Sequence, residues 1–339
     1  MTELSELTSL RVGGAARNFV EVSTESEIIA ALKSAGNGPV LILGGGTNLL
    51  VSDDGFAGTV IHITNSNIAS EVDACSGATL TIGAGQNWDE LVAITVERGF
   101  AGLETLSGIP GTVGAAPIQN IGAYGHEVSE FITQVRTFDR QTQQIKTFIN
   151  SECQFSYRNS FFKQAQGRYI VIAVSFQLRI GEETKPIKYE ELATHLGVKV
   201  GEKVSLAAAR KAVLEIRARK GMLLNPSDAD SWSAGSFFTN PIVSADVAAK
   251  LPAGAPRWPQ SDGRVKVSAA WLMEHAGVEK GFTSNGAGIS TKHVLAITNR
   301  GTATAADLIA VAQIARDKVR DAYGITLEPE VNLVGLNLR

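Results

Sequence analysis

A glycine-rich segment, LSGIPGTVGAAPIQNIGAYG, occupies residues 106–125 and constrains the fold more than any other feature. Its five glycines and two prolines allow turns and positive φ angles that larger side chains oppose. A second segment, GGGTNLL, covers residues 44–50 and follows the apolar run PVLIL. Neither matches the GxGxxG dinucleotide fingerprint or the GxxxxGK[ST] phosphate loop. Backbone N–H groups would therefore have to bind any anion here, which suits a large anionic cofactor. Simple tight turns are the alternative interpretation.

The length and charge of the chain exclude several classes of protein. With 339 residues, 44% of them hydrophobic and 19% charged, it is expected to form two or three domains. A net charge of −3 argues against a nucleic-acid partner. Cys75 and Cys153 are far apart, which argues against a disulfide scaffold or a zinc site, and no metal is expected. The N-terminus lacks a signal-peptide pattern and no apolar run reaches membrane-spanning length, so we expect a cytoplasmic protein.

The hydrophobic periodicity predicts α and β elements in consecutive modules. A capping box at Thr24 and Glu27 starts a helix that Gly36 ends, and a second helix is expected from Asn87 to Gly99. Further helices are predicted over residues 206–220 and 304–323. Strands are predicted over residues 17–22, 39–43, 79–85, 135–139, 146–149, 169–180 and 326–335.

Five motifs in order resemble the UDP-N-acetylenolpyruvoylglucosamine reductase (UDP-N-acetylmuramate dehydrogenase) family. They are LGGGTNLLVSDDGF, LSGIPGTVGAAPIQNIGAYGHEV, YRNSFFK, AGSFFTNP and LEPEV, and the resemblance extends over residues 7–335. It implies an enzyme of peptidoglycan precursor synthesis that binds FAD and uses NADPH as co-substrate. The implied reaction reduces UDP-N-acetylglucosamine enolpyruvate to UDP-N-acetylmuramate.

The resemblance also implies an α+β flavoprotein with a vanillyl-alcohol-oxidase-type (PCMH-like) FAD-binding fold. FAD-binding subdomains would span residues 1–66 and 67–220, a substrate domain residues 221–324, and a C-terminal strand, residues 325–339, would return to the active site. Neither glycine segment contains His or Cys, which favours non-covalent FAD, although His126 follows closely. The implied FAD contacts are Gly44, Gly45, Gly46, Thr47, Asn48, Leu49, Ser107, Gly108, Ile109, Pro110, Gly111, Gly114, Gln119, Asn120, Gly122, Ala123 and Tyr124.

Three residues are implied to carry the chemistry. Hydride would pass from NADPH to flavin N5 and then to C3 of the enolpyruvyl group, so negative charge develops at C2 beside a carboxylate. Arg158 would bind that carboxylate, because guanidinium is always charged and binds in a bidentate way. Ser236 would donate the proton to C2, and Glu330 would orient the site. Without the resemblance, Arg158 would be a structural arginine, Ser236 a turn residue and Glu330 an edge carboxylate.

Four further residues are implied to bind substrate. Tyr189, which marks a subtype with an extra loop, and Lys220 would reach the diphosphate. Asn240 and His293 would line the same cleft. The expanded segment GMLLNPSDADSW, residues 221–232, departs from the family pattern and leaves the diphosphate contacts open.

Two other classes share some of these features. A flavin-dependent sugar or lactone oxidase of the same fold would have both glycine segments but would not need the Arg, Ser and Glu set. A non-catalytic nucleotide-sugar or flavin-binding protein is the third class. A monomer is expected, with no nucleic-acid or membrane partner.

Overall fold

Two compact units make up the protein, and both are built from discontinuous segments. The structure is a computed structural model that describes residues 1–73 and 75–339. The sheet unit contains residues Arg17–Gly45 and Ala57–Leu223. The C-terminal unit contains residues Met1–Ala16, Gly46–Phe56 and Leu224–Arg339. The first glycine segment therefore crosses from one unit to the other between Gly45 and Gly46.

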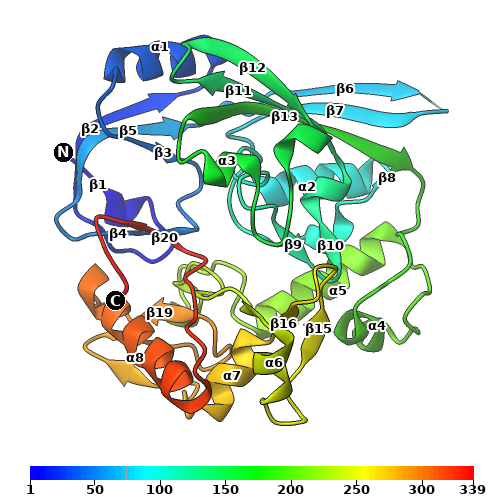
Figure 1. Ribbon diagram of the computed structural model, residues 1–339. Helices are drawn as coiled ribbons and strands as arrows, with labels where there is room; N and C mark the ends of the chain where they lie inside the picture. The colour runs from blue at the N-terminus through cyan, green and yellow to red at the C-terminus, as the bar shows by residue number, and fades with distance from the viewer. Residues whose placement is uncertain (74) are drawn as a thin grey trace. The chain divides into compact units, whose positions relative to one another are not determined.

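A large antiparallel sheet forms the centre of the sheet unit. Its strand order is β12-β11-β13-β7-β6, and β8 pairs with the end of β13. Figure 1 shows β6 and β7 continuing side by side as a ribbon beyond the other strands. The bounds are β6 Ile68–Asp73, β7 Gly77–Gly83, β8 Phe100–Ala101, β11 Ile132–Asp139, β12 Gln144–Ile149 and β13 Tyr169–Ile180.

A second sheet has the order β1-β2-β5-β3, with β3 and β5 parallel and β1 and β2 antiparallel. Its strands are β1 Thr2–Glu3, β2 Ala15–Val22, β3 Val40–Leu43 and β5 Phe56–Ile63. A short hairpin of β9 (Gly122–Ala123) and β10 (His126–Glu127) follows the second glycine segment.

The first two helices of the sheet unit begin at their predicted caps, whereas α3 and α4 were not predicted. Thr24 accepts a hydrogen bond from the N–H of Glu27, whose carboxylate accepts one from the N–H of Thr24, so α1 starts with the predicted capping box. Asn87 caps the second predicted helix in a similar way. The helices are α1 Glu25–Ala35, α2 Trp88–Glu97, α3 Phe161–Gln164, α4 Glu190–Leu196 and α5 Leu206–Arg219, with 3-10 turns η2 Glu104–Leu106, η3 Val128–Glu130 and η4 Asn150–Cys153.

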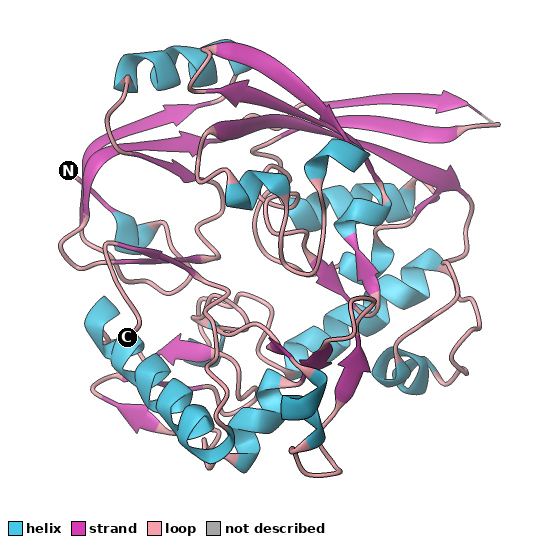
Figure 2. Ribbon diagram, viewed as in Figure 1, coloured by secondary structure: helices cyan, strands magenta, loops and turns pink. Residues whose placement is uncertain are grey.

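The C-terminal unit joins both ends of the chain around one core. Strand β4 (Leu49–Val51) pairs in parallel with β20 (Asn332–Val334), and Leu10, Val12 and Leu50 pack into the same apolar cluster as α7 and α8. Long loops connect its short elements (Figure 2). The other helices and strands of this unit are η1 Leu4–Glu6, η5 Ala229–Ser231, β14 Ile242–Val243, α6 Ala245–Ala249, β15 Arg257–Pro259, β16 Val265–Val267, α7 Ala269–His275, β17 Thr283–Ser284, β18 Ala287–Ile289, β19 Ile297–Asn299 and the long helix α8 Ala305–Tyr323.

The last predicted strand is shorter than expected. Only Asn332–Val334 form β20, whereas residues 326–331 precede it and contain a single bridge, between Pro329 and Phe238. The N–H of Glu330 bonds to the carbonyl of Phe237, whereas that of Asn332 bonds to the carbonyl of Asn48, so pairing with β4 begins only after Glu330. Glu330 therefore lies before the strand rather than on one of its faces.

Candidate functional site

The two glycine segments contact each other in the sheet unit. An added Cβ at Gly45 would lie 3.0 Å from Cα of Gly111, and one at Gly44 would meet the side chain of Thr112. Gly111 has φ +122°, a conformation that favours glycine. The absence of side chains at these glycines therefore allows the two segments to pack against each other, in addition to any close approach of a cofactor.

The second segment is fastened to the β7–α2 connection by backbone hydrogen bonds. The N–H of Val113 donates to Gln86, that of Gly114 donates to Ala84, and the carbonyl of Gly111 accepts from Trp88. In the described chain, the N–H groups of Ser107–Gly114 that make no hydrogen bond within the protein belong to Ile109, Gly111 and Thr112. These three N–H groups form the part of the segment that can donate to an anion.

Asn120 has its side chain committed to the protein. Its amide nitrogen donates to Glu127 and to the carbonyl of Ser156, and its amide oxygen accepts from the N–H of Ser129. Asn120 is fully buried and has φ +47°. The side chain therefore ties the second glycine segment to the YRNS turn, which sequence reasoning did not foresee.

Arg158 lies against the second glycine segment. Its Nη2 donates to the carbonyl of Gly122 at 2.8 Å, and its own carbonyl accepts from Nζ of Lys163 at 3.0 Å. The backbone has φ +51°, which is uncommon for an arginine and is typical of positions held by their surroundings. The structure therefore places this predicted residue next to the predicted cofactor wall.

Tyr124 and Tyr189 meet edge to face, with ring centroids 5.7 Å apart. Tyr189 precedes α4 and is about half exposed. Burial raises the pKa of Tyr124 to about 12, and burial followed by the charge of Glu191 also raises the pKa of Tyr189. In both cases the buried environment disfavours the phenolate form.

Lys220, at the end of α5, belongs to the same region. Its Nζ pairs with Glu191 at 2.6 Å, and α4 packs on α5. Two predicted substrate residues, Lys220 and Tyr189, are thus joined through the first turn of α4.

The C-terminal unit brings Ser236 and Glu330 to neighbouring positions. The carbonyl of Phe237 accepts from the N–H of Glu330 at 2.8 Å, and Phe238 forms the bridge to Pro329. Phe237 and Phe238 are buried and anchor this pairing in the core. Asn48 is close as well, because its amide donates to the carbonyl of Glu330.

Ser236 is partly exposed, and among the described residues its hydroxyl has no hydrogen-bond partner. A serine that acts only as a helix cap or turn residue normally bonds the backbone through its hydroxyl. The Ser236 hydroxyl is thus available to bond a group outside the protein.

The other two predicted substrate residues have different surroundings. The Asn240 amide oxygen accepts from the N–H of Ala269 at 2.9 Å, at the start of α7. His293 lies in the segment whose Leu295 carbonyl accepts from the N–H of Phe237. Asn240 thus has a structural contact, whereas the His293 segment flanks that of Ser236.

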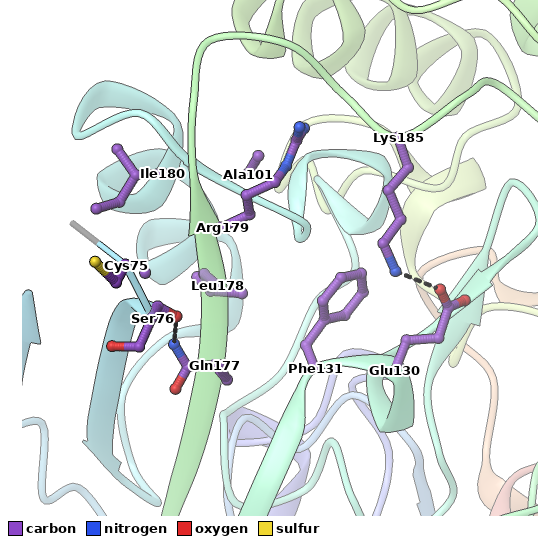
Figure 3. A pocket seen from close by; sticks show the side chains of 11 residues that line it. Cys75, Ser76, Ala101, Glu130, Phe131, Gln177, Leu178, Arg179, Ile180 and Lys185 are labelled. Atoms are coloured by element: carbon purple, nitrogen blue, oxygen red, sulfur yellow. Dashed lines mark hydrogen bonds and ion pairs between the residues drawn. The ribbon is translucent and has the colours of Figure 1, made fainter. Parts of the chain in front are cut away.

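His126 is a buried structural residue on β10. Its Nδ1 is 3.1 Å from both carboxylate oxygens of Glu130. Glu130 also pairs with Lys185, and both residues line a cavity of about 350 Å³. Figure 3 shows the Lys185 side chain directed at Glu130, and the Gln177 side-chain amide donating to the carbonyl of Ser76. These polar groups are satisfied by one another. We therefore do not assign the cavity to the candidate site.

Three charged residues near the second glycine segment, Asp89, Arg210 and Arg217, were not predicted from the sequence. Asp89 accepts from the N–H of Gly108 at 2.6 Å and binds Arg210 through two hydrogen bonds, of 2.6 and 2.9 Å. Arg217 donates to the carbonyl of Gly108 at 3.0 Å. The only sequence signal is the seven-residue spacing of the arginines, which places both on one face of α5.

Comparisons with known proteins identify the class of this chain. Residues 16–147 match a family model described as an FAD binding domain. Together with the mixed α+β architecture, this defines the chain as an FAD-binding flavoprotein and confirms the expected vanillyl-alcohol-oxidase-type fold class.

The particular family follows from the rest of the chain. Residues 225–334 match the model of the UDP-N-acetylenolpyruvoylglucosamine reductase C-terminal domain. The UDP-N-acetylenolpyruvoylglucosamine reductases of Cutibacterium acnes and Streptomyces avermitilis are 51% and 48% identical; the alignments cover 99% of this chain and 90% and 94% of theirs. The crystal structure of that reductase from Thermus caldophilus aligns with a TM-score of 0.67 at 26% identity, over 98% of this chain and 97% of that one. The chain belongs to the UDP-N-acetylenolpyruvoylglucosamine reductase family.

Among the described residues, no helix combines the length and the apolar character that crossing a lipid bilayer requires.

Proposed function

We propose that this protein is an FAD-dependent reductase that uses NADPH to convert UDP-N-acetylglucosamine enolpyruvate into UDP-N-acetylmuramate, a step of peptidoglycan precursor synthesis. Family membership supports the overall reaction. The observation that supports the assignment of residues is the backbone hydrogen bond from Glu330 to Phe237, the residue that follows Ser236 in the chain.

The residues of the glycine segments fit FAD. Ile109, Gly111 and Thr112 offer N–H groups with no bond inside the described protein, and such groups bind phosphate oxygens well. Gly108, Val113 and Gly114 keep their N–H groups for the protein and contribute shape instead. Neither segment carries a His or Cys, and the nearby His126 is engaged by Glu130, which supports non-covalent binding. When bound, FAD supplies the redox chemistry of the enzyme, accepting hydride from NADPH and delivering it to the substrate.

Ser236, Glu330 and Arg158 would control the charge that forms on the substrate. Hydride addition at C3 leaves an electron pair at C2, conjugated with the substrate carboxylate. The Arg158 guanidinium would neutralise that carboxylate. The Ser236 hydroxyl would donate its proton to C2, with Glu330 setting the orientation of the donor.

The substrate diphosphate would be bound by Tyr189 and Lys220. The Tyr189 hydroxyl would donate a hydrogen bond to a phosphate oxygen, and Lys220 would exchange its partner Glu191 for the phosphate. Asn240 and His293 would complete the substrate contacts. Assignment to the subtype with the extra tyrosine-bearing loop, the four-part division at residues 66, 220 and 324, monomeric state and cytoplasmic location are parts of the same proposal.

Anaerobic and aerobic stopped-flow measurements test this function against a flavin oxidase. NADPH is expected to bleach the flavin rapidly, with slow recovery in air and fast recovery on addition of the enolpyruvyl substrate. Fast recovery in air alone would identify an oxidase. A colourless protein that fails to take up FAD would refute both.

A further inference from the structure

Gly108 is held from both sides by charged side chains. Its N–H donates to the carboxylate of Asp89 at 2.6 Å, and its carbonyl accepts from Nε of Arg217 at 3.0 Å. Hydrogen bonds to charged groups are stronger than those between neutral ones. Both the donor and the acceptor of this one residue are therefore fixed by strong bonds.

Asp89 is itself fixed in place. It lies in the first turn of α2, where a carboxylate is favoured, and it binds both terminal nitrogens of Arg210. Burial opposes its ionisation, yet the hydrogen bonds from Arg210 and Gly108 outweigh burial and lower the pKa of Asp89. The residue is thus a carboxylate at neutral pH.

Glycine is required at the held position. Gly108 has φ +70°, and an added Cβ would lie 2.7 Å from the side chain of Leu223 and 2.9 Å from that of Leu214. Because Arg210, Leu214 and Arg217 all belong to α5, this helix fixes Gly108 by both packing and hydrogen bonding.

The held residue comes directly before the N–H groups that can donate to an anion. Ile109 is its neighbour, and Gly111 and Thr112 follow within the same turn-rich segment. A rotation of the peptides at Gly108 would reorient these donors, since glycine by itself has wide conformational freedom.

We propose that Asp89, Arg210 and Arg217 are positioning residues for the cofactor, which hold Gly108 so that the N–H groups of Ile109, Gly111 and Thr112 are preorganised to bind the FAD diphosphate. This inference rests on the proposed flavoenzyme function. It predicts that the three residues set the affinity for FAD without contacting it.

Asp139 provides a matched control in the same unit. It also accepts one backbone N–H, from Gln141, and binds Arg168 through two hydrogen bonds, but it lies on β11. Asp89→Asn and Asp139→Asn therefore remove the same kind of charge from the same kind of hydrogen-bond set. Only the first touches the glycine segment.

The experiment titrates FAD into the deflavinated full-length protein and follows quenching of flavin fluorescence, with thermal unfolding recorded in parallel. Asp89→Asn is expected to raise the Kd for FAD about 10- to 100-fold, the range for hydrogen bonds to a charged group. Asp139→Asn is expected to lower the unfolding temperature but to leave the Kd within about twofold, since distant sites act independently.

Substitution of Arg210 tests the same network without altering the acceptor. Arg210→Gln is expected to raise the FAD Kd, and Arg210→Lys to recover most of the affinity because it keeps the charge beside Asp89. These variants decide the matter if Asp89→Asn does not fold. Equal FAD affinity in wild type, Asp89→Asn and Arg210→Gln, or equal losses for the two aspartates, would overturn the inference. A wild-type protein that takes up no FAD would instead refute the proposed function and, with it, this role.

Discussion

Ser236→Ala is expected to slow one half-reaction and spare the other. Neighbouring Phe237 is fixed through both its N–H, to Leu295, and its carbonyl, from Glu330, and its ring is buried. Loss of the Ser236 hydroxyl breaks no hydrogen bond within the described structure, so we expect the backbone to keep its conformation. The substitution therefore isolates the chemical role of the hydroxyl.

The magnitude follows from the kind of step that is lost. Removal of a general acid slows the step it serves by roughly 10² to 10⁴, which corresponds to about 3 to 5 kcal/mol of activation free energy. The free energy of unfolding is expected to change by no more than about 0.5 kcal/mol, as is usual for a partly exposed side chain without specific contacts. Activity and stability should thus separate clearly.

Stopped-flow absorbance measures the two half-reactions in turn. Flavin bleaching by NADPH should remain near the wild-type rate, because no proton donor for C2 is needed before the substrate binds. Reoxidation by the enolpyruvyl substrate should carry the whole loss. Ser236→Cys should recover part of it, and Glu330→Gln should damage the same half-reaction.

Ser233→Ala is the matched control. Its buried hydroxyl accepts from the N–H of Gly235 in the same loop, so its loss disturbs the turn but removes no proposed proton donor. Equal slowing of both half-reactions by Ser236→Ala, no slowing of either, or the same profile for Ser233→Ala would refute the reasoning. Ser236 would then be a turn residue.

Three further perturbations test the fold and the glycine segments. Gly45→Val should reduce FAD content after purification, because its side chain would displace the backbone of Gly111. Gly254→Val should retain full flavin, since nothing lies within 4 Å of a Cβ added there. Equal flavin content in the two variants would count against the packing of the two segments. Phe238→Ala should lower the free energy of unfolding by about 3 to 5 kcal/mol in chemical denaturation, the usual range for a buried phenylalanine, and a loss below about 1 kcal/mol would contradict its anchoring role. The pKa of Glu130 is lowered from 4.5 to about 2: burial opposes this shift, but the hydrogen bonds from His126 and Lys185 outweigh it, so its contribution to stability is complete above pH 4.5 and is lost as the pH falls toward 2. Glu130→Gln should flatten that acid limb in thermal unfolding, and an unchanged limb would exclude this carboxylate as its source.

Local signals explain why much of the fold could be predicted. The capping box at Thr24 and Glu27, the stop at Gly36 and the period-two pattern of Tyr169–Ile180 all describe contacts between residues near in sequence, and α1 and β13 form as expected. The final strand is shorter than predicted because the N–H of Glu330 bonds to Phe237, far away in the sequence, instead of to β4, and no local pattern describes that contact.

The sequence by itself determined the class of chemistry, because the order of five motifs identifies the family whatever their distances in space. Tertiary structure alone decided which groups meet. Glu330 bonds to Phe237, and Arg158 bonds to the carbonyl of Gly122. Gly108 bonds to both Asp89 and Arg217. These pairs are 19 to 109 residues apart in the chain, and hydrophobic periodicity and turn chemistry describe only neighbours within a few residues. The physical reason is that a polar group pairs with whatever partner folding brings within hydrogen-bond distance, and that partner is set by the packing of whole elements.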